Sequence, residues 1–144
     1  MEETHVWSDR LDLGHDALDR EHHLQMALVS GLVDAFERGR PRLARQLLEQ
    51  LAGFSKAHFG GEELLMELAG YRQLDAHRQE HQAMLSEIEE IRYLQDRGEH
   101  DLALPMLIDL RNGVASHIAA SDRRFAEYSQ SASVTGAVPA PAGP

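Results

Sequence analysis

Apolar residues recur at spacings of three and four along most of the chain, a pattern typical of helices that bury one face. The first predicted helix covers residues 16–38 and ends before Gly39. The second begins at Pro41, because proline suits the first turn of a helix, and it ends near Gly70. Both glycines are typical of the position just beyond a helix C-terminus. The inward stripe of the second helix is predicted to run as far as Leu65.

The same pattern predicts two more helices. The third covers residues 74–97 and is closed by Gly98, and the fourth begins near Asp101. Pro105 fits the fourth helix only within its first turn, since proline in a helix interior removes a hydrogen bond. No segment alternates like a strand, and short links make consecutive helices antiparallel. The sequence therefore predicts an all-α, up-down-up-down antiparallel four-helix bundle.

The two ends of the chain differ in composition from the middle. The residues before the first helix are expected to form an N-terminal loop. Residues 129–144, SQSASVTGAVPAPAGP, are rich in Ser, Ala, Pro and Gly and show no helical period, which is typical of a flexible, disordered tail. We therefore expect one bundle domain over residues 1–128, followed by this C-terminal tail.

Polar side chains interrupt the apolar stripes at positions that face the predicted core. His22 shares its stripe with Leu18 and Met26, whereas the adjacent His23 falls on the water-facing side of the same helix. On the second and third helices, polar pairs four residues apart project toward common points. The inward polar set comprises His22, His58, Glu62, His77, His81, His117 and Asp122.

The last two members of this set need a local explanation. His117 and Asp122 are five residues apart, which is about 140° around an ideal helix at ~100° per residue. Two arrangements would bring both side chains to one site. Either they converge from adjacent turns, or a π-bulge realigns them, as such bulges often do at functional positions.

A metal centre is the economical explanation for seven buried polar groups, each of which would cost roughly several kcal/mol if left uncompensated. The chain has no cysteine, so any metal must use nitrogen and oxygen ligands. Two carboxylates can each bridge two ions, an oxygen from water can add a third bridge, and five histidines then divide three and two. The ion with two histidines then keeps one vacant coordination position. These ligands suit iron better than magnesium or calcium, although zinc or manganese could occupy the same site.

Charge and hydropathy argue against other classes of partner. With 24 acidic and 14 basic residues the formal net charge is −10, which repels phosphate backbones and anionic lipids, so neither nucleic acid nor a membrane is expected as a partner. No apolar run approaches the ~20 residues of a membrane span, and the first residues lack signal-peptide features, so we expect a cytoplasmic protein. His5, His15 and His100 lie off the stripes and are expected to be solvated.

The inward polar residues stand in four motifs that resemble the hemerythrin family, particularly its bacterial single-domain members. The motifs are DREH, HFGGEELLM, GYRQLDAHRQEH and HIAASDRRF, and the resemblance covers the chain from about Trp7 to Tyr128. It implies a non-haem di-iron site, with a bridging oxo or hydroxo group, that binds O2 reversibly. The ligands it implies are His77, His81 and His117 on the saturated iron, His22 and His58 on the open iron, and Glu62 and Asp122 as bridges.

The resemblance favours a protein that carries, stores or scavenges O2 over an enzyme. Two other functions stay open. The domain could report O2 or redox state to a protein partner, which the sequence does not identify, or the open iron could support peroxidase, NO-handling or oxidase-like activity. No acid or base beyond the ligands is recognisable from the sequence to support an enzyme.

Two adjacent glycines, Gly60 and Gly61, stand between His58 and Glu62, where each costs a helix roughly 1 kcal/mol relative to alanine. On a helical wheel Gly61 lies about 60° from His58, and Gly60 points roughly away from it, at ~100° per residue. The hypothesis is that Gly61 leaves space beside the open iron or a neighbouring helix, whereas Gly60 has no role in the pocket.

The chain departs from the common family pattern just before His117. A bulky Trp-Leu pair is frequent there in the family, and this chain has Gly113 and Val114. Less bulk near the pocket would admit water or larger ligands, and rapid loss of the oxygenated state is the expected consequence.

Overall fold

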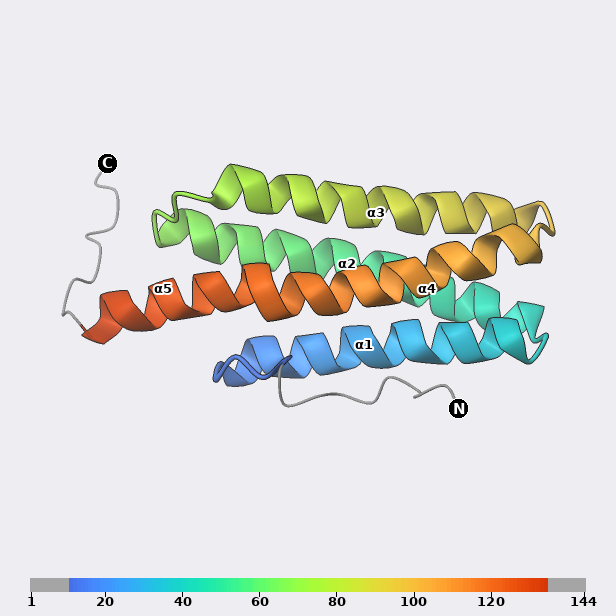
Figure 1. Ribbon diagram of the computed structural model, residues 1–144, viewed down its shortest axis with the longest axis horizontal. Coiled ribbons are helices and arrows are strands. Elements are labelled where there is room, and N and C mark those ends of the chain that lie inside the picture. The colour runs from blue at the N-terminus through green and yellow to red at the C-terminus, as the bar shows by residue number, and fades with distance from the viewer. Residues whose placement is uncertain (1–10, 135–144) are drawn as a thin grey trace.

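The computed structural model of the chain describes residues 11–134, which form a bundle of long helices (Figure 1). Helix α1 spans Asp16–Glu37, α2 Pro41–Leu68, α3 Leu74–Asp96 and α4 His100–His117. A π-helical segment, Ile118–Asp122, continues α4 and leads directly into α5, Arg123–Val134. Because these last three elements form one continuous rod, the predicted all-α four-helix bundle is confirmed.

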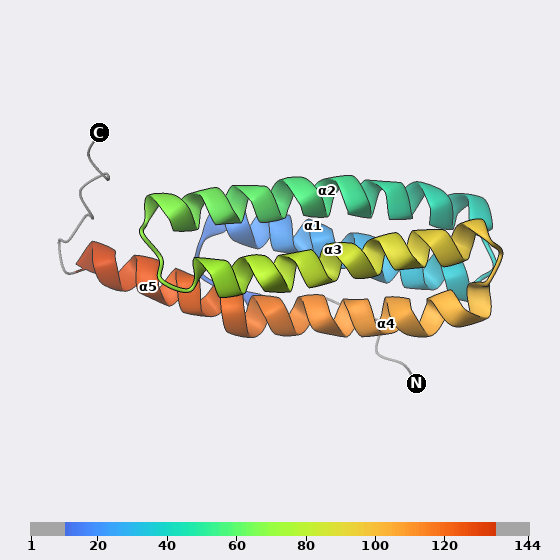
Figure 2. The same ribbon diagram turned by 90° about the horizontal axis from the view of Figure 1, so that it is seen from above.

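The helices pack in a ring that follows the chain order. Each of α1, α2 and α3 contacts the next helix, and α4 closes the ring against α1. Figures 1 and 2 show the four helices along one common axis, with α5 extending the line of α4 beyond the end of the bundle. None of the helices within residues 11–134 has both the length and the apolar character needed to cross a membrane.

Glycines end three of the helices as predicted. Gly39, Gly70 and Gly98 follow α1, α2 and α3 in the left-handed backbone region, with φ of 64°, 66° and 73°, which glycine adopts without a steric penalty. Beyond α1, for example, the Arg40 N–H donates a 2.9 Å hydrogen bond to the Ala35 carbonyl, which would otherwise lack a partner. These caps let consecutive helices reverse direction within a few residues.

The helix starts are less regular than predicted. His15 Nδ1 accepts a 3.2 Å hydrogen bond from the Leu18 N–H and so caps α1, a role beyond the solvated side chain that we expected. Pro41 opens α2 as predicted. Pro105, however, is the sixth residue of α4 and not part of its first turn. Both Pro105 and Asp101 are exposed, so water can hydrogen bond to the carbonyl that the proline leaves without a helical donor.

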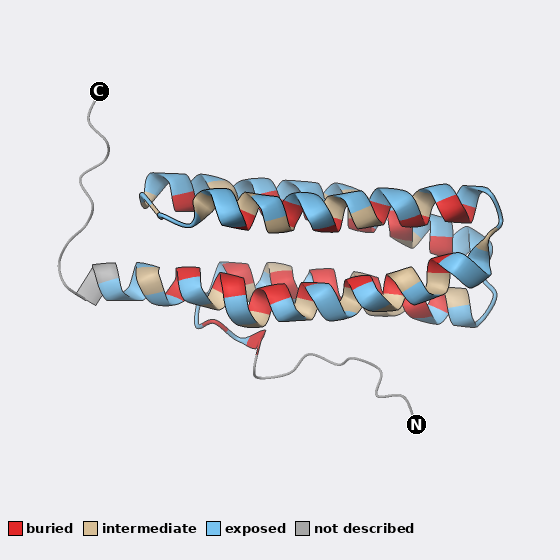
Figure 3. Cartoon of the chain, turned by 45° about the horizontal axis from the view of Figure 1, so that its top comes forward, coloured by how far each residue is buried: buried red, intermediate tan, exposed pale blue. Residues whose placement is uncertain are grey.

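Apolar stripes from the four helices meet in one core, and Figure 3 shows the buried positions turned toward neighbouring helices. Val29, Leu51 and Ile91 are completely buried. On α2 the stripe differs from the prediction near its end. Met66 is buried, whereas Leu65, which we expected to point inward, is 42 % exposed. Met66 lies four residues after Glu62 and therefore shares the helix face of Glu62.

The C-terminal helix is longer than the composition indicated. Helix α5 reaches Val134, although we expected a tail from residue 129 onward. Gln130 Nε2 donates to the Leu13 carbonyl at 3.4 Å, so these turns contact the segment that precedes α1. The rest of the expected tail, residues 135–144, and residues 1–10 of the expected N-terminal loop lie outside the described residues.

Candidate metal centre

All seven side chains of the inward polar set lie together in the interior of the bundle. None of them is more than 5 % exposed. Helix α1 contributes one residue, α2 and α3 two each, and α4 and the π-helical segment one each. The seven are His22, His58, Glu62, His77, His81, His117 and Asp122. His23, which follows His22 in the sequence, is 48 % exposed, which confirms the predicted orientation of these two consecutive histidines.

The π-helical segment brings His117 and Asp122 to the same side of the helix although they are five residues apart. Residues 118–122 have the wider π-helical turn, which brings Asp122 back under His117. The Asp122 Oδ1 atom lies 3.2 Å from His117 Nε2. Of the two arrangements that the sequence left open, realignment by a π-bulge is therefore the one adopted.

Glu62 turns its two carboxylate oxygens toward different histidines. Its Oε2 atom lies 3.1 Å from His22 Nε2 and 3.4 Å from His58 Nε2. Its Oε1 atom lies 3.2 Å from His81 Nε2 and 4.0 Å from His77 Nε2. The carboxylate therefore stands between a two-histidine group and a second group of histidines.

Asp122 divides its oxygens in the same way. Its Oδ2 atom lies 3.0 Å from His22 Nε2, and its Oδ1 atom lies 2.9 Å from His77 Nε2 and close to His117 Nε2. We call His77, His81 and His117 the three-histidine group, and His22 and His58 the two-histidine group. Both carboxylates lie between the two groups, and each presents one oxygen to each side.

The nitrogen and oxygen atoms of the cluster are arranged better for coordinating metal ions than for hydrogen bonding to one another. Ligands in adjacent positions about 2.1 Å from one ion lie about 3 Å apart, close to the nitrogen–oxygen distances of this cluster. Several of these nitrogen and oxygen atoms nevertheless have no hydrogen-bond partner, although buried polar atoms normally have one. These atoms include the Nε2 atoms of His58 and His77, Glu62 Oε1 and both oxygens of Asp122. Imidazole and carboxylate donors together suit iron, zinc or manganese.

Three further carboxylates hold the outer nitrogens of the histidines. Glu21 lies 2.9 Å from His58 Nδ1, and Glu63 lies 2.8 Å from His81 Nδ1. Glu80 lies 3.3 Å from His117 Nδ1. Each carboxylate is placed to accept a hydrogen bond from Nδ1–H, which would leave the Nε2 lone pair directed inward for a metal.

These outer carboxylates were not among the predicted site residues, although the sequence contains a signal for them. Glu21 precedes His22, Glu63 follows Glu62 and Glu80 precedes His81. A residue next to a ligand lies ~100° around the helix and so faces a neighbouring helix of the bundle. Each of the three glutamates does reach a histidine on the next helix, which spacing within a single helix could not indicate.

Glu80 also connects the cluster to the π-helical segment. The Ser121 hydroxyl donates to both Glu80 oxygens, at 2.8 and 2.9 Å. Partial burial raises the pKa of Glu80, but the hydrogen bonds from Ser121 and His117 outweigh this and lower it below its usual value. An ionised Glu80 thus fixes His117 from outside the cluster.

The histidines and carboxylates of the cluster shift one another's pKa values, so that His22 holds its proton more tightly. Burial lowers the pKa of His22, but hydrogen bonds to Asp122 and Glu62 outweigh it and raise that pKa to about 9. Burial also raises the pKa of both carboxyl groups, yet the surrounding histidines hold the pKa of Glu62 and of Asp122 below the usual value. Metal binding has to displace these protons, because a ligating imidazole is neutral.

Aromatic rings cover the two histidine groups differently. The buried Phe59 ring stacks on His81 at a centroid distance of 4.1 Å and meets His117 edge-on at 6.2 Å. Phe54 stacks on His58 from the same helix at 5.8 Å. Phe59 also lies 5.8 Å from His58, so this buried ring contacts both histidine groups and stacks on the three-histidine group.

The glycines near the cluster do not line it. Gly60, Gly61 and Gly113 are all exposed, and a Cβ atom added at any of them would meet nothing within 4 Å. The hypothesis that Gly61 makes room for the open ion or a neighbouring helix is therefore wrong. Val114 is buried in the core, whereas Gly113 lies on the surface and lines a pocket of about 410 Å³ together with His117.

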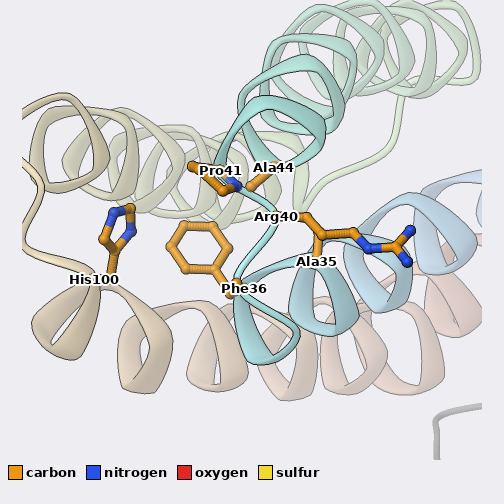
Figure 4. A pocket seen from close by; sticks show the side chains of 7 residues that line it. Ala35, Phe36, Arg40, Pro41, Ala44 and His100 are labelled. Atoms are coloured by element: carbon orange, nitrogen blue, oxygen red, sulfur yellow. The ribbon is translucent and has the colours of Figure 1, made fainter.

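A separate pocket lies at the other end of the bundle, where α1 turns into α2 and α4 begins (Figure 4). It has a volume of about 320 Å³ and is lined by Ala35, Phe36, Gly39, Arg40, Pro41, Ala44 and His100. In Figure 4 the Phe36 ring faces the pocket between His100 and Pro41, while the Arg40 side chain extends away. With one histidine and no carboxylate in its lining, it does not resemble a metal site.

Known proteins are similar to this chain over the region that contains the cluster. Residues 13–128 match the family described as "Hemerythrin HHE cation binding domain". A bacteriohemerythrin from Stenotrophomonas maltophilia is 27 % identical over 122 residues, which cover 85 % of this chain and 79 % of that protein. One from Pseudomonas aeruginosa is 31 % identical over 94 residues, or 65 % of this chain and 61 % of that protein. Myohemerythrin-1 from Phascolopsis gouldii is 26 % identical over 124 residues, covering 85 % and 92 %.

Proposed function

The chain belongs to the hemerythrin family, and on this premise we propose that its buried cluster holds two iron ions and binds O2 reversibly. When bound, two ferrous ions supply the two electrons that O2 takes up on binding and returns on release. The observation that carries the proposal is the position of Glu62 and Asp122, which each present one oxygen to either histidine group. A carboxylate so placed is suited to be shared by two ions.

The two halves of the cluster offer different numbers of donors. In this proposal His77, His81 and His117, with one oxygen from each shared carboxylate, hold one ion. His22 and His58, again with one oxygen from each carboxylate, hold the other. The two-histidine half thus has one protein donor fewer, which favours it as the place where an external ligand binds.

The remaining residues orient the ligands and exclude water. Glu21, Glu63 and Glu80 hold the Nδ1 protons of three histidines, which keeps each Nε2 directed inward. The bundle buries the cluster almost completely, so the proposed ligand would bind away from bulk solvent. Both features favour retention of the ions in a fixed arrangement while a small ligand enters and leaves.

The proposal is tested by metal analysis and by the optical spectrum of the reduced protein before and after exposure to O2. We expect about two irons per chain and a spectral change that reverses under argon. A single tightly bound metal at full occupancy, or a spectral change that argon does not reverse, would contradict it.

The proposed role is carriage, storage or scavenging of O2, and a turnover assay separates it from an enzymatic role. We expect the protein to consume no more than about a stoichiometric amount of hydrogen peroxide. Sustained consumption over many turnovers would identify an enzyme instead.

A further inference from the structure

A buried polar pair that is not part of the metal cluster lies beside it. Gln25 on α1 donates from Nε2 to Ser55 Oγ on α2 at 3.1 Å, and the two side chains are 1 % and 0 % exposed. Gln25 lies three residues after His22, and Ser55 lies three residues before His58. Because α1 and α2 are antiparallel, both residues are one turn from the two-histidine group in the same direction.

The pair has hydrogen-bonding capacity that the protein does not use. Gln25 Oε1 is buried and has no hydrogen-bond partner. The Gln25–Ser55 bond uses the serine oxygen as an acceptor, so it leaves the hydroxyl hydrogen available to another acceptor. A buried acceptor without a partner is costly, which makes an unfilled one next to a ligand site informative.

Gln25 and Ser55 stand out from the apolar side chains in the layers one turn beyond the cluster. One turn beyond the cluster in the opposite direction, the side chains are the buried Leu18, Met66 and Phe125 and the half-buried Leu74, all apolar. In the direction of Gln25 and Ser55, the corresponding residues on α3 and α4 are Met84 and Val114, also apolar and buried. The polar pair is therefore the polar part of the layer that it shares with Met84 and Val114, one turn from the two-histidine group.

We propose that Gln25 and Ser55 form a subsite for a small protic ligand, water or hydrogen peroxide, beside the two-histidine group. Gln25 Oε1 accepts a hydrogen from such a ligand, and the Ser55 hydroxyl donates to its oxygen. Neither O2 nor azide carries a hydrogen to donate to Gln25 Oε1. The subsite thus distinguishes protic from aprotic ligands. This inference rests on the proposed function, because it needs a ligand-binding metal in the two-histidine half.

The test compares Gln25→Met with Gln95→Met in the iron-loaded protein. Methionine keeps the length of the side chain but removes the amide, and Gln95 is a matched control because it is also a buried glutamine, bonded to the Pro41 carbonyl at 3.3 Å near the far end of the bundle. One probe is hydrogen peroxide, which takes one electron from each of two ferrous ions and, with two protons from solvent, becomes two waters. The other is azide, bound to the diferric protein.

We expect Gln25→Met to raise the half-saturating peroxide concentration about fivefold, the effect of losing one hydrogen bond, and to leave the azide dissociation constant within about twofold. Gln95→Met should change neither. An unchanged peroxide response in Gln25→Met, or an equal weakening of peroxide and azide, would overturn the subsite. Gln25→Leu provides a second variant should methionine itself perturb the site.

Thermal melting of the iron-free variants gives a readout that does not depend on ligand binding. Gln95→Met should lower the melting temperature because it breaks a hydrogen bond, whereas Gln25→Met, which also removes an unsatisfied acceptor, should lower it less or raise it. An equal loss in both variants would make Gln25 a structural residue and overturn the subsite. Wild-type protein that holds no iron or fails to bind azide would instead contradict the proposed function itself.

Discussion

His22 and His23 are neighbours in the sequence but have opposite environments, since His22 is fully buried against Glu62 and Asp122 while His23 is 48 % exposed. We predict that His22→Ala lowers the iron content below two per chain, because it removes a donor that contacts both shared carboxylates. His23→Ala should leave iron content and the O2-dependent spectrum nearly unchanged. Iron analysis of the two variants checks this, and the reverse result would contradict the assigned helix orientation.

Val114 is the residue next to the cluster whose size should control solvent entry. It is buried three residues before His117, whereas Gly113 is exposed. We predict that Val114→Leu slows the decay of the oxygenated spectrum in stopped-flow measurements by filling space near the ligand, provided that it avoids an overpacking penalty of ~1–3 kcal/mol.

Gly113→Ala is the matched control for the Val114 variant. Its added Cβ atom would meet nothing within 4 Å, so the decay should not change, and the free energy of unfolding should rise by roughly 1 kcal/mol from the gain in helix propensity. If Val114→Leu keeps its iron and its stability but decays as fast as the wild type, Val114 does not limit solvent entry.

At the scale of single elements, the π-helical segment sets the position of Asp122. It accommodates one residue more than an α-helix would between His117 and Asp122. We predict that deleting the exposed Ala120 converts the segment to α-helix and retains iron, because residues four apart share a helix face. Deleting both Ala119 and Ala120 turns Asp122 by a further ~100°, to ~60° on the other side of His117, and should weaken binding of the second ion.

Iron content and helicity by circular dichroism distinguish these two deletions. A single deletion that loses iron while remaining fully helical would show that the π geometry itself is required, and not just the shared face. The same measurements on the double deletion confirm that any loss of iron comes from rotation of Asp122 and not from unfolding.

At the scale of the whole molecule, the cluster links stability to pH and to metal. In the iron-free protein the pKa of His22 is raised to about 9, so its stabilising contribution is complete below pH ~6.5 and is lost as the pH rises through about 9. The lowered pKa values of Glu62 and Asp122 contribute stability above pH ~4 that is lost on acidification. We predict that the melting temperature of iron-free protein is highest at about pH 5 to 6.5.

The iron-loaded protein should respond differently. Iron binds neutral imidazole and releases the protons of the cluster, so the stabilisation by iron should increase between pH ~6.5 and 9, where the iron-free protein loses up to roughly 3 kcal/mol. Melting curves of both forms across this range test the prediction. An equal melting temperature with and without iron would contradict a buried metal site.

Most of the fold could be predicted because it depends on local signals. The three- and four-residue period locates four helices, and Gly39, Gly70 and Gly98 end three of them in the structure as the sequence predicted. Where local rules competed with packing, the predictions failed. Pro105 lies beyond the first turn of α4 because its missing donor affects only an exposed carbonyl, and α5 continues to Val134 despite its composition.

The sequence alone determined that the seven predicted site residues point inward, because helical phase separates His22 from His23 and groups each i, i+4 pair on one face. Only the tertiary structure decided what those side chains meet. The division of the Glu62 and Asp122 oxygens between two histidine groups, the outer carboxylates and the Gln25–Ser55 pair all join residues on different helices. A periodic pattern fixes direction around one helix axis, but contacts between helices depend on how the four axes are aligned and spaced.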